Sequence, residues 1–133
     1  MKNIGFKKVI TIGISAYCLR YAIFGSEFLP LWIIVISQAF HGFCYAFFFA
    51  AAYIYVDKLA DEDVRHSAQT VFGIIILGGG PVIGGWLSGF LQSVNTANGI
   101  FNFSSFWYTL SLIGFVTTIL FFMFFKEELT ERE

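Results

Sequence analysis

The sequence predicts an all-α integral membrane protein with four transmembrane helices. Its composition is 57% hydrophobic and only 13% charged, whereas soluble domains have about 25% charged residues. One uncharged stretch, residues 31–55, is longer than the roughly 20 apolar residues that a helix needs to cross a bilayer core about 30 Å thick. The alternation expected of a β-barrel strand is absent, so each apolar segment must satisfy its backbone groups as a helix.

The first apolar segment covers residues 9–24 and contains Arg20. At 1.5 Å per residue, Arg20 lies roughly 16 Å past Val9, beyond the bilayer midplane. An arginine at that depth is costly and is usually paired or directed into a wet cavity. Two interpretations stay open: the side chain snorkels outward, towards Glu27, or makes a structural pair; alternatively it contacts a substrate or acts in gating.

The second segment, residues 31–55, carries polar and aromatic side chains at spacings of three and four, which place them on one helix face. These residues are Gln38, His41, Tyr45, Phe48 or Phe49, and Ala52. An amide, an imidazole, a phenol and aromatic planes near the bilayer centre suit a ligand that stacks and also forms hydrogen bonds, such as a nucleobase with a sugar. A hydrogen-bonded contact between helices, with no ligand, fits the spacing equally well.

The third segment, residues 68–94, is rich in glycine and contains Pro81. Gly80 with Gly84, and Gly85 with Gly89, form two small-xxx-small pairs that allow another helix to approach closely. Pro81 removes a backbone donor and usually kinks a helix. Tight packing around a static kink and a moving hinge are both compatible with this pattern, and both require partner helices.

The fourth segment, residues 106–125, has Trp107 and Tyr108 at one end and is followed by Lys126. Amphipathic rings favour the membrane interface, and basic residues favour the cytoplasmic side. All the basic residues outside the segments precede the first, separate the second from the third, or follow the fourth: Lys2, Lys7, Lys8, Lys58, Arg65, Lys126 and Arg132. The opposite loops contain Glu27 as their only charge. We therefore predict that both termini are cytoplasmic.

The linker between the second and third segments reads DKLADEDVRH over residues 57–66. Its simplest role is to begin the third helix in water. A gating role, in which Asp57 or Arg65 pairs with another cytoplasmic loop in one conformation only, is the alternative.

Several function classes are disfavoured. The net charge of −1 gives no reason to expect nucleic acid as a partner. Cys18 and Cys44 each lie in an apolar run without a second ligand at metal-binding spacing, so no metal, disulfide or other cofactor is predicted. The GGGP run lies in an apolar helix and lacks the Lys-Ser/Thr of a phosphate loop. No nucleophile and base pair is evident, so we do not expect an enzyme.

Several runs of residues, in order, carry a resemblance to a known family. They are KKVITIGISAYCLRYAIFG, HGFCYAFFFAAAYIYVDK, VRHSAQ with the glycine-rich segment, NGIFNFSSFWYTL and FFMFFKEE. The chain resembles, over essentially its whole length, the last third of bacterial nucleoside:proton symporters of the major facilitator superfamily. The most specific matches are LRYA around Arg20, HGxCY with the later IYVDK, and R-x-SAQ.

The resemblance implies that these are the last four helices of a twelve-helix fold in the bacterial inner membrane, working with missing N-terminal helices by alternating access. It implies proton-coupled uptake of a nucleoside or nucleoside-like solute. His41 and Tyr45 match the family's substrate-contacting positions. In that mechanism His41 and Gln38 would hydrogen-bond the ligand, and Tyr45 and Phe49 would stack on it. Ala46 departs from the family, because an acid is expected there.

Two other classes remain as alternatives. The chain could be a self-contained four-helix transporter that assembles from several copies, similar in size to small multidrug transporters. Those rely on a glutamate in the first helix, where this chain has Arg20. It could also be a non-transporting membrane protein that pairs with other helices.

Overall fold

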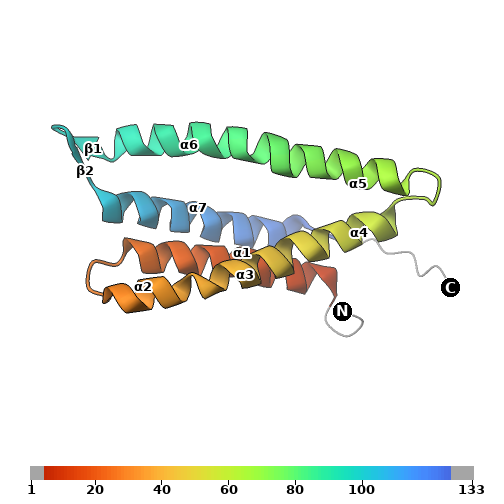
Figure 1. Ribbon diagram of the computed structural model, residues 1–133, viewed down its shortest axis with the longest axis horizontal. Coiled ribbons are helices and arrows are strands. Elements are labelled where there is room, and N and C mark those ends of the chain that lie inside the picture. Colours follow the sequence, from red (N-terminus) through yellow and green to blue (C-terminus); the bar gives the residue numbers. More distant parts are fainter. Residues whose placement is uncertain (1–4, 127–133) are drawn as a thin grey trace.

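The computed structural model describes residues 5–126 and contains four long apolar helical spans, and each span runs antiparallel to the one before it (Figure 1). This arrangement confirms the predicted class, an all-α membrane protein with four membrane-spanning helices. The start of the first span, the turn between the second and third, and the end of the fourth lie at one end of the bundle. Lys2 and Arg132, used above to predict orientation, lie outside the described residues.

The spans are built from the following elements. The first is α1 (Phe6–Gly25), and the fourth is α7 (Phe103–Phe124). The second span, Leu31–Leu59, joins α2 (Leu31–Ser37), α3 (Ala39–Cys44), η1 (Tyr45–Ala50) and α4 (Ala51–Leu59). The third span, Arg65–Val94, joins α5 (Arg65–Gly73), η2 (Ile74–Gly79) and α6 (Gly80–Val94). A short hairpin of β1 (Thr96–Ala97) and β2 (Ile100–Phe101) precedes α7.

The helices extend up to four residues beyond the apolar segments that predicted them. The second span continues from residue 55 to Leu59, and the third begins at Arg65 instead of residue 68. Apolar runs mark the part of a helix that lies in hydrocarbon, whereas the helix itself continues into polar residues at the interface. At the start of α7, Asn102 supplies a side-chain cap by accepting a hydrogen bond from the Ser105 backbone N–H at 2.8 Å.

Two π-helical segments interrupt the long spans. One, η1, covers YAFFFA in the second span. The other, η2, ends directly before Gly80 and Pro81 in the third span. Pro81, which has no backbone N–H to donate, is the second residue of α6, directly after the π-helical turns. Wide turns of this kind are found mostly as local bulges, often at functional sites.

The hairpin between the third and fourth spans comes from an Asn-Gly turn. Asn98 and Gly99 both have positive φ, at 54° and 77°. Those values are required in the two-residue turn that matches the twist of paired strands, and Asn-Gly is the preferred sequence for it.

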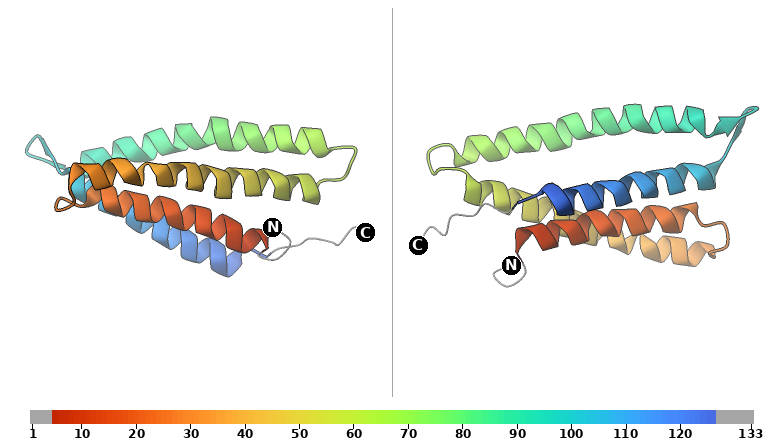
Figure 2. Two further views of the ribbon diagram at one scale, coloured as in Figure 1. Left: turned by 60° about the horizontal axis from the view of Figure 1, so that its bottom comes forward. Right: turned by 180° about the vertical axis from the view of Figure 1, so that it is seen from behind.

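The first and fourth spans form the closest pair of helices, as two further views agree (Figure 2). A Cβ added at Gly114 would lie 3.6 Å from Cβ of Cys18, an ordinary contact distance, so α7 lies directly against α1 at this level. At the same level the Ser111 hydroxyl donates to the Cys18 carbonyl at 2.9 Å, and the Cys18 thiol donates to the Ser111 carbonyl at 3.1 Å. Near the end of α1 the Ser104 hydroxyl donates to the Gly25 carbonyl.

The second span crosses α1 next to the buried core. Phe6, Val9 and Ile10 of α1 pack with Ala51, which has no exposed surface. A Cβ added at Gly13 would come within 2.8 Å of the Phe48 backbone nitrogen, so this glycine permits the crossing. The register between α1 and the second span is therefore set by a backbone contact.

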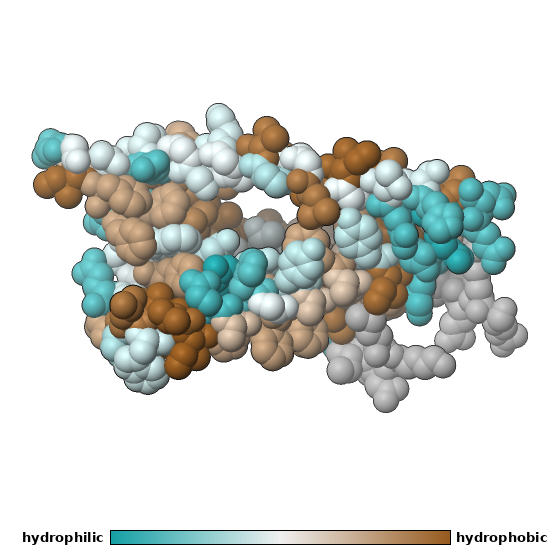
Figure 3. All heavy atoms as spheres, in the orientation of Figure 1, coloured by the Kyte–Doolittle hydropathy of each residue, from teal (hydrophilic) through white to brown (hydrophobic). Residues whose placement is uncertain are grey.

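The third span is the least packed part of the molecule. It contacts α4 near its beginning and α7 and β1 near its end, and Figure 3 shows an opening between its middle and the other spans. An added Cβ at Gly80, Gly84, Gly85 or Gly89 would meet nothing within 4 Å in the part of the chain that the structure describes. The two predicted small-xxx-small pairs are thus not used in packing among residues 5–126.

Candidate functional site

A polar cluster joins the first and second spans on the surface of the described bundle. It consists of Arg20 from α1, Gln38 from the junction of α2 and α3, and His41 from α3. One terminal nitrogen of Arg20 donates to Oε1 of Gln38 at 2.9 Å, and the other lies 3.2 Å from Nδ1 of His41. In the space-filling view a hydrophilic patch lies over α1 and α3, surrounded by apolar surface (Figure 3).

The polar cluster lies well inside the predicted hydrocarbon. Gln38 and His41 follow Leu31 by seven and ten residues, which places them roughly 10 and 15 Å along the second span. Arg20 precedes Gly25 by five residues, so it lies roughly 7 Å from that end of α1. All three residues thus lie roughly 7 to 15 Å from the helix ends that flank the loop between α1 and α2, on two adjacent spans.

The structure decides part of the question about Arg20. No ion pair joins Arg20 to Glu27, which instead lines an open pocket of about 380 Å³ with Asn102 and Tyr108, at the end of the bundle that holds the loop between α1 and α2. The guanidinium carbon lies 4.9 Å from the centre of the Phe24 ring. The partners of Arg20 are an amide, an imidazole and an aromatic face. The outward snorkel towards Glu27 is therefore not observed, and Arg20 is directed to the second span.

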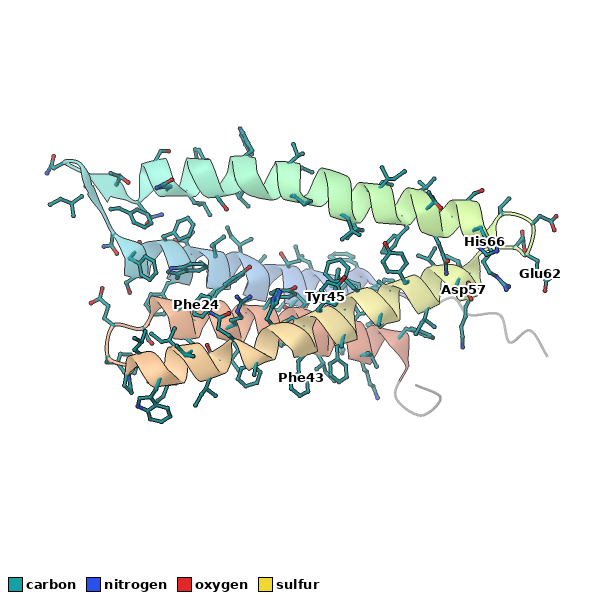
Figure 4. All side chains as sticks on the ribbon, viewed as in Figure 1. Phe24, Phe43, Tyr45, Asp57, Glu62 and His66 are labelled. Atoms are coloured by element: carbon teal, nitrogen blue, oxygen red, sulfur yellow. The ribbon has the colours of Figure 1, made fainter. Side chains whose placement is uncertain are left out.

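An aromatic pair continues the polar cluster along the second span. The rings of Tyr45 and Phe49 lie 4.8 Å apart, and Tyr45 is 55% exposed. Figure 4 shows Tyr45 pointing from the second span towards the third, while Phe43 points to the opposite side. On α1, the Tyr17 ring lies edge-on to the His41 ring at 6.1 Å.

Two residues of the predicted face of the second span, Gln38 and His41, contact the same side chain, Arg20. Tyr45, one helical turn further along, is exposed. The π-helical turns of η1 then change the register. Phe49 stays beside Tyr45, Phe48 packs against the buried core, and Ala52 is buried. Of the two phenylalanines that the spacing left open, Phe49 is the one that continues the face.

Asp57 and Arg65, the predicted gating residues, pair with each other. The Arg65 Nε lies 3.7 Å from Oδ1 of Asp57, and the Gln69 amide donates to the same oxygen at 3.0 Å. Together they join the end of α4 to the start of α5. In the described conformation this contact closes the turn between the second and third spans.

The remaining predicted positions lie apart from the polar cluster or show no hydrogen bond to it. Pro81 is exposed at the start of α6. Ala46, at the position of the acid implied by the resemblance, is exposed in η1 and brings no charge. Among residues 5–126 no group of three side chains is arranged to bind a metal. Cys44 is fully buried, and Cys18 bonds to Ser111.

Sequence reasoning missed the residues around Arg20 on its own helix. Tyr17 precedes Arg20 by three residues and Phe24 follows it by four, so both lie on the same face of α1. That spacing could have indicated that both rings lie beside Arg20. Gln69 was also missed, although it lies one turn beyond Arg65 on α5, where it can reach the same carboxylate.

Comparisons with known proteins point to a single family. A family model described as "Nucleoside H+ symporter" matches residues 1–130. The chain is 32% identical over 136 residues to YegT of Escherichia coli (strain K12), covering 95% of this chain and 32% of YegT. It is 30% identical to the "Nucleoside permease NupG" and 24% identical to the "Xanthosine permease", both of the same organism, each alignment covering 95% of this chain and 31% of the relative. No solved structure matches. The chain spans about a third of the length of these relatives.

Proposed function

Because this chain belongs to the nucleoside:proton symporter family, we propose that it forms part of a multi-pass membrane transporter for nucleosides or nucleoside-like solutes. The observation that carries the proposal is the polar cluster beside the Tyr45 and Phe49 rings. Charged and polar groups within a membrane span are expensive, and they mark substrate or ion pathways by default. A cluster next to exposed aromatic rings offers both hydrogen bonds and stacking surfaces, which are the two contacts a nucleoside requires.

Each residue of the site has a proposed role. His41 and Gln38 hydrogen-bond the ligand, and Tyr45 and Phe49 stack on it. The Tyr45 ring is more than half exposed and points towards the third span, so a planar base can reach one of its faces. Arg20 contacts His41 and Gln38 directly and holds both in place.

Transport by alternating access requires more helices than the four described. In major facilitator folds, substrate binds near the midplane between two helical halves that rock against each other. We propose that the open side of the polar cluster faces such a second half. Two features support this: the chain spans about a third of its relatives' length, and the glycines of the third span from Gly78 to Gly89 have no described neighbour.

Proton coupling and membrane orientation are further parts of the proposal. Ala46 lacks the acid that the family resemblance implies, and no carboxylate takes part in the polar cluster. If the family's acid acts at this position, Ala46→Asp will strengthen the dependence of uptake on external pH. A pH profile that does not move would remove that role. We place both termini in the cytoplasm of a bacterial inner membrane, because Lys7, Lys8, Lys58, Arg65 and Lys126 gather at one end.

The central test is uptake of labelled nucleosides by the product of the complete gene, in bacteria without their own nucleoside carriers. His41→Ala and Tyr45→Ala should abolish uptake without lowering the amount of protein in the membrane. Phe43→Ala is the matched control, since Phe43 is an equally exposed aromatic residue two positions from Tyr45 on the opposite side of the span. Uptake that survives both site variants would remove His41 and Tyr45 from the binding site.

A further inference from the structure

Arg20 keeps hydrogen-bond donors that its contacts within residues 5–126 do not use. A guanidinium has five N–H groups and no acceptor. One terminal nitrogen donates to Oε1 of Gln38 at 2.9 Å, and the other lies 3.2 Å from Nδ1 of His41. The Nε atom is buried without a hydrogen-bond partner among the described residues. An N–H group on each terminal nitrogen and the one at Nε are therefore left over.

The positive charge of Arg20 has no counter-charge in the described part of the chain. Neither an amide nor an imidazole supplies a negative charge, and the Phe24 ring offers only the negative face of a quadrupole. None of the described carboxylates pairs with Arg20. Glu27 lines the pocket beside the loop between α1 and α2, and Asp57 pairs with Arg65. The others lie in the turn between α4 and α5, at the end of the bundle opposite Phe24 (Figure 4): Asp61, Glu62 and Asp63.

A counter-charge becomes important when the site closes. Arg20 lies in a membrane span, where a charged side chain is costly unless it is paired or faces a wet cavity. In the described conformation both hydrogen bonds of Arg20 are exposed, so water can reach the guanidinium. Alternating access passes through a state in which the site is closed to both sides of the membrane, and closure expels water. Opposite charges attract much more strongly in that drier site.

Resting on the proposed function, we infer that Arg20 binds an anionic oxygen group that comes from outside residues 5–126 when the site closes. Guanidinium N–H groups form their strongest hydrogen bonds with such oxygens. The terminal nitrogens lie at the exposed contacts with Gln38 and His41, so a group that arrives from outside can reach them. The group has two possible sources: an acidic side chain of another membrane span in the complete transporter, or an acidic group on the solute itself.

The first measurement removes the charge at residue 20. Uptake of a labelled nucleoside and the amount of protein in the membrane are compared for the product of the complete gene and its Arg20→Gln variant, in cells without their own nucleoside carriers. Arg20→Met, which keeps much of the aliphatic chain, is carried through the same tests as a second charge-free variant. Lys8→Gln is the matched control and should keep its uptake, because Lys8 is an exposed cation at the other end of α1.

Neutralising acids elsewhere in the protein tests the first source. If an acidic side chain pairs with Arg20, uptake in Arg20→Gln should fall about 10- to 100-fold, the equivalent of one hydrogen bond to a charged group. The loss arises because the carboxylate is left unpaired in the closed site. Each acidic residue in the other membrane spans is then replaced by its amide. One such replacement should restore uptake, or membrane abundance where that was lost, by at least tenfold.

An acidic solute tests the second source. The probe is a labelled nucleoside whose 5′ carbon is oxidised to a carboxylate, compared with the parent nucleoside. If the solute supplies the anionic group, the unaltered protein should take up the acid about tenfold better than the parent, and the charge-free variants should lose this preference. No rescue by any neutralised acid, together with no preference for the acid, overturns the inference and leaves the proposed function intact. Absence of uptake of every nucleoside by the unaltered protein overturns the proposed function itself.

Discussion

The first and third spans both carry glycine in apolar helices, but Gly13 and Gly25 of the first lie against other spans, whereas the glycines of the third span from Gly78 onward meet no other part of the described chain. Gly13 of α1 lies against the backbone of Phe48, and Gly114 of α7 lies against Cys18. Gly80, Gly84, Gly85 and Gly89 of the third span face open space among residues 5–126. In lipid, helices associate through close packing and interhelical hydrogen bonds, not through burial of apolar surface. The difference teaches that glycine content alone does not identify a packed face.

The contact between α1 and the second span also holds the candidate site in place. Arg20 can reach Gln38 and His41 only if α1 and the second span keep their register. That register depends on the backbone contact at Gly13, roughly 10 Å along α1 from Arg20. The third span, in contrast, has no hydrogen bond to the polar cluster among the described residues. Substitutions in the two regions should therefore have different effects, and their contrast can be measured.

Gly13→Leu should have the largest effect. Its Cβ would come within 2.8 Å of the Phe48 nitrogen, and a backbone atom cannot move aside as a flexible side chain can. We expect a loss of about 2 to 3 kcal/mol in the free energy of unfolding, within the range measured for overpacking. The measurement is the temperature at which the buried thiol of Cys44 becomes reactive to a maleimide in detergent micelles. An unchanged midpoint would show that α1 and η1 are farther apart than described.

Ser111→Ala should have a smaller effect, of about 1 kcal/mol. The Ser111 hydroxyl donates to the Cys18 carbonyl and is almost completely buried, but the loss of a single hydrogen bond between helices in a membrane is modest. The same Cys44 reaction reports the shift in midpoint. Thr117→Ala is the control, because its exposed hydroxyl bonds only to the Ile113 carbonyl of its own helix. Equal shifts in the two variants would mean that the bond between α1 and α7 contributes nothing specific.

Asp57→Asn should weaken only the turn between the second and third spans. The ion pair with Arg65 is partly exposed, so its contribution is about 0.5 kcal/mol, and the amide variant can still accept from Gln69. Faster hydrogen exchange in the first turn of α5, with no change in α1 or α7, is the expected result. Faster exchange in α1 as well would show that the turn supports the whole bundle.

The sequence predicted the features that depend on composition and local spacing. Four apolar runs defined the spans, and the cost of a charge in hydrocarbon singled out Arg20. Spacing of three and four placed Gln38 and His41 on one face, and both side chains contact Arg20. Asn98 with Gly99 also carried a readable hairpin signal, which the search for spans overlooked. Each of these features depends on the residues of a single segment.

The rest depends on contacts between segments, which spacing does not encode. The partner of Arg20 follows from the register of α1 on the second span, so the choice between Glu27 and the pair Gln38 and His41 could not be made from sequence. The π-helical turns of η1 broke the regular period, so Ala52 left the predicted face. The same limit applied to glycine, because the pattern at Gly84 looked more like a packing motif than the isolated Gly13.

Gly84→Leu should have the smallest effect on the described bundle. An added Cβ there meets nothing within 4 Å, so the Cys44 midpoint should match that of the unaltered protein, in contrast to Gly13→Leu. A fall as large as that of Gly13→Leu would mean that the third span packs against the other three more closely than described. Uptake by the complete gene product separates two further outcomes. Lost uptake with an unchanged midpoint would place a helix against Gly84 from outside residues 5–126, whereas unchanged uptake would show that this glycine face needs no close partner.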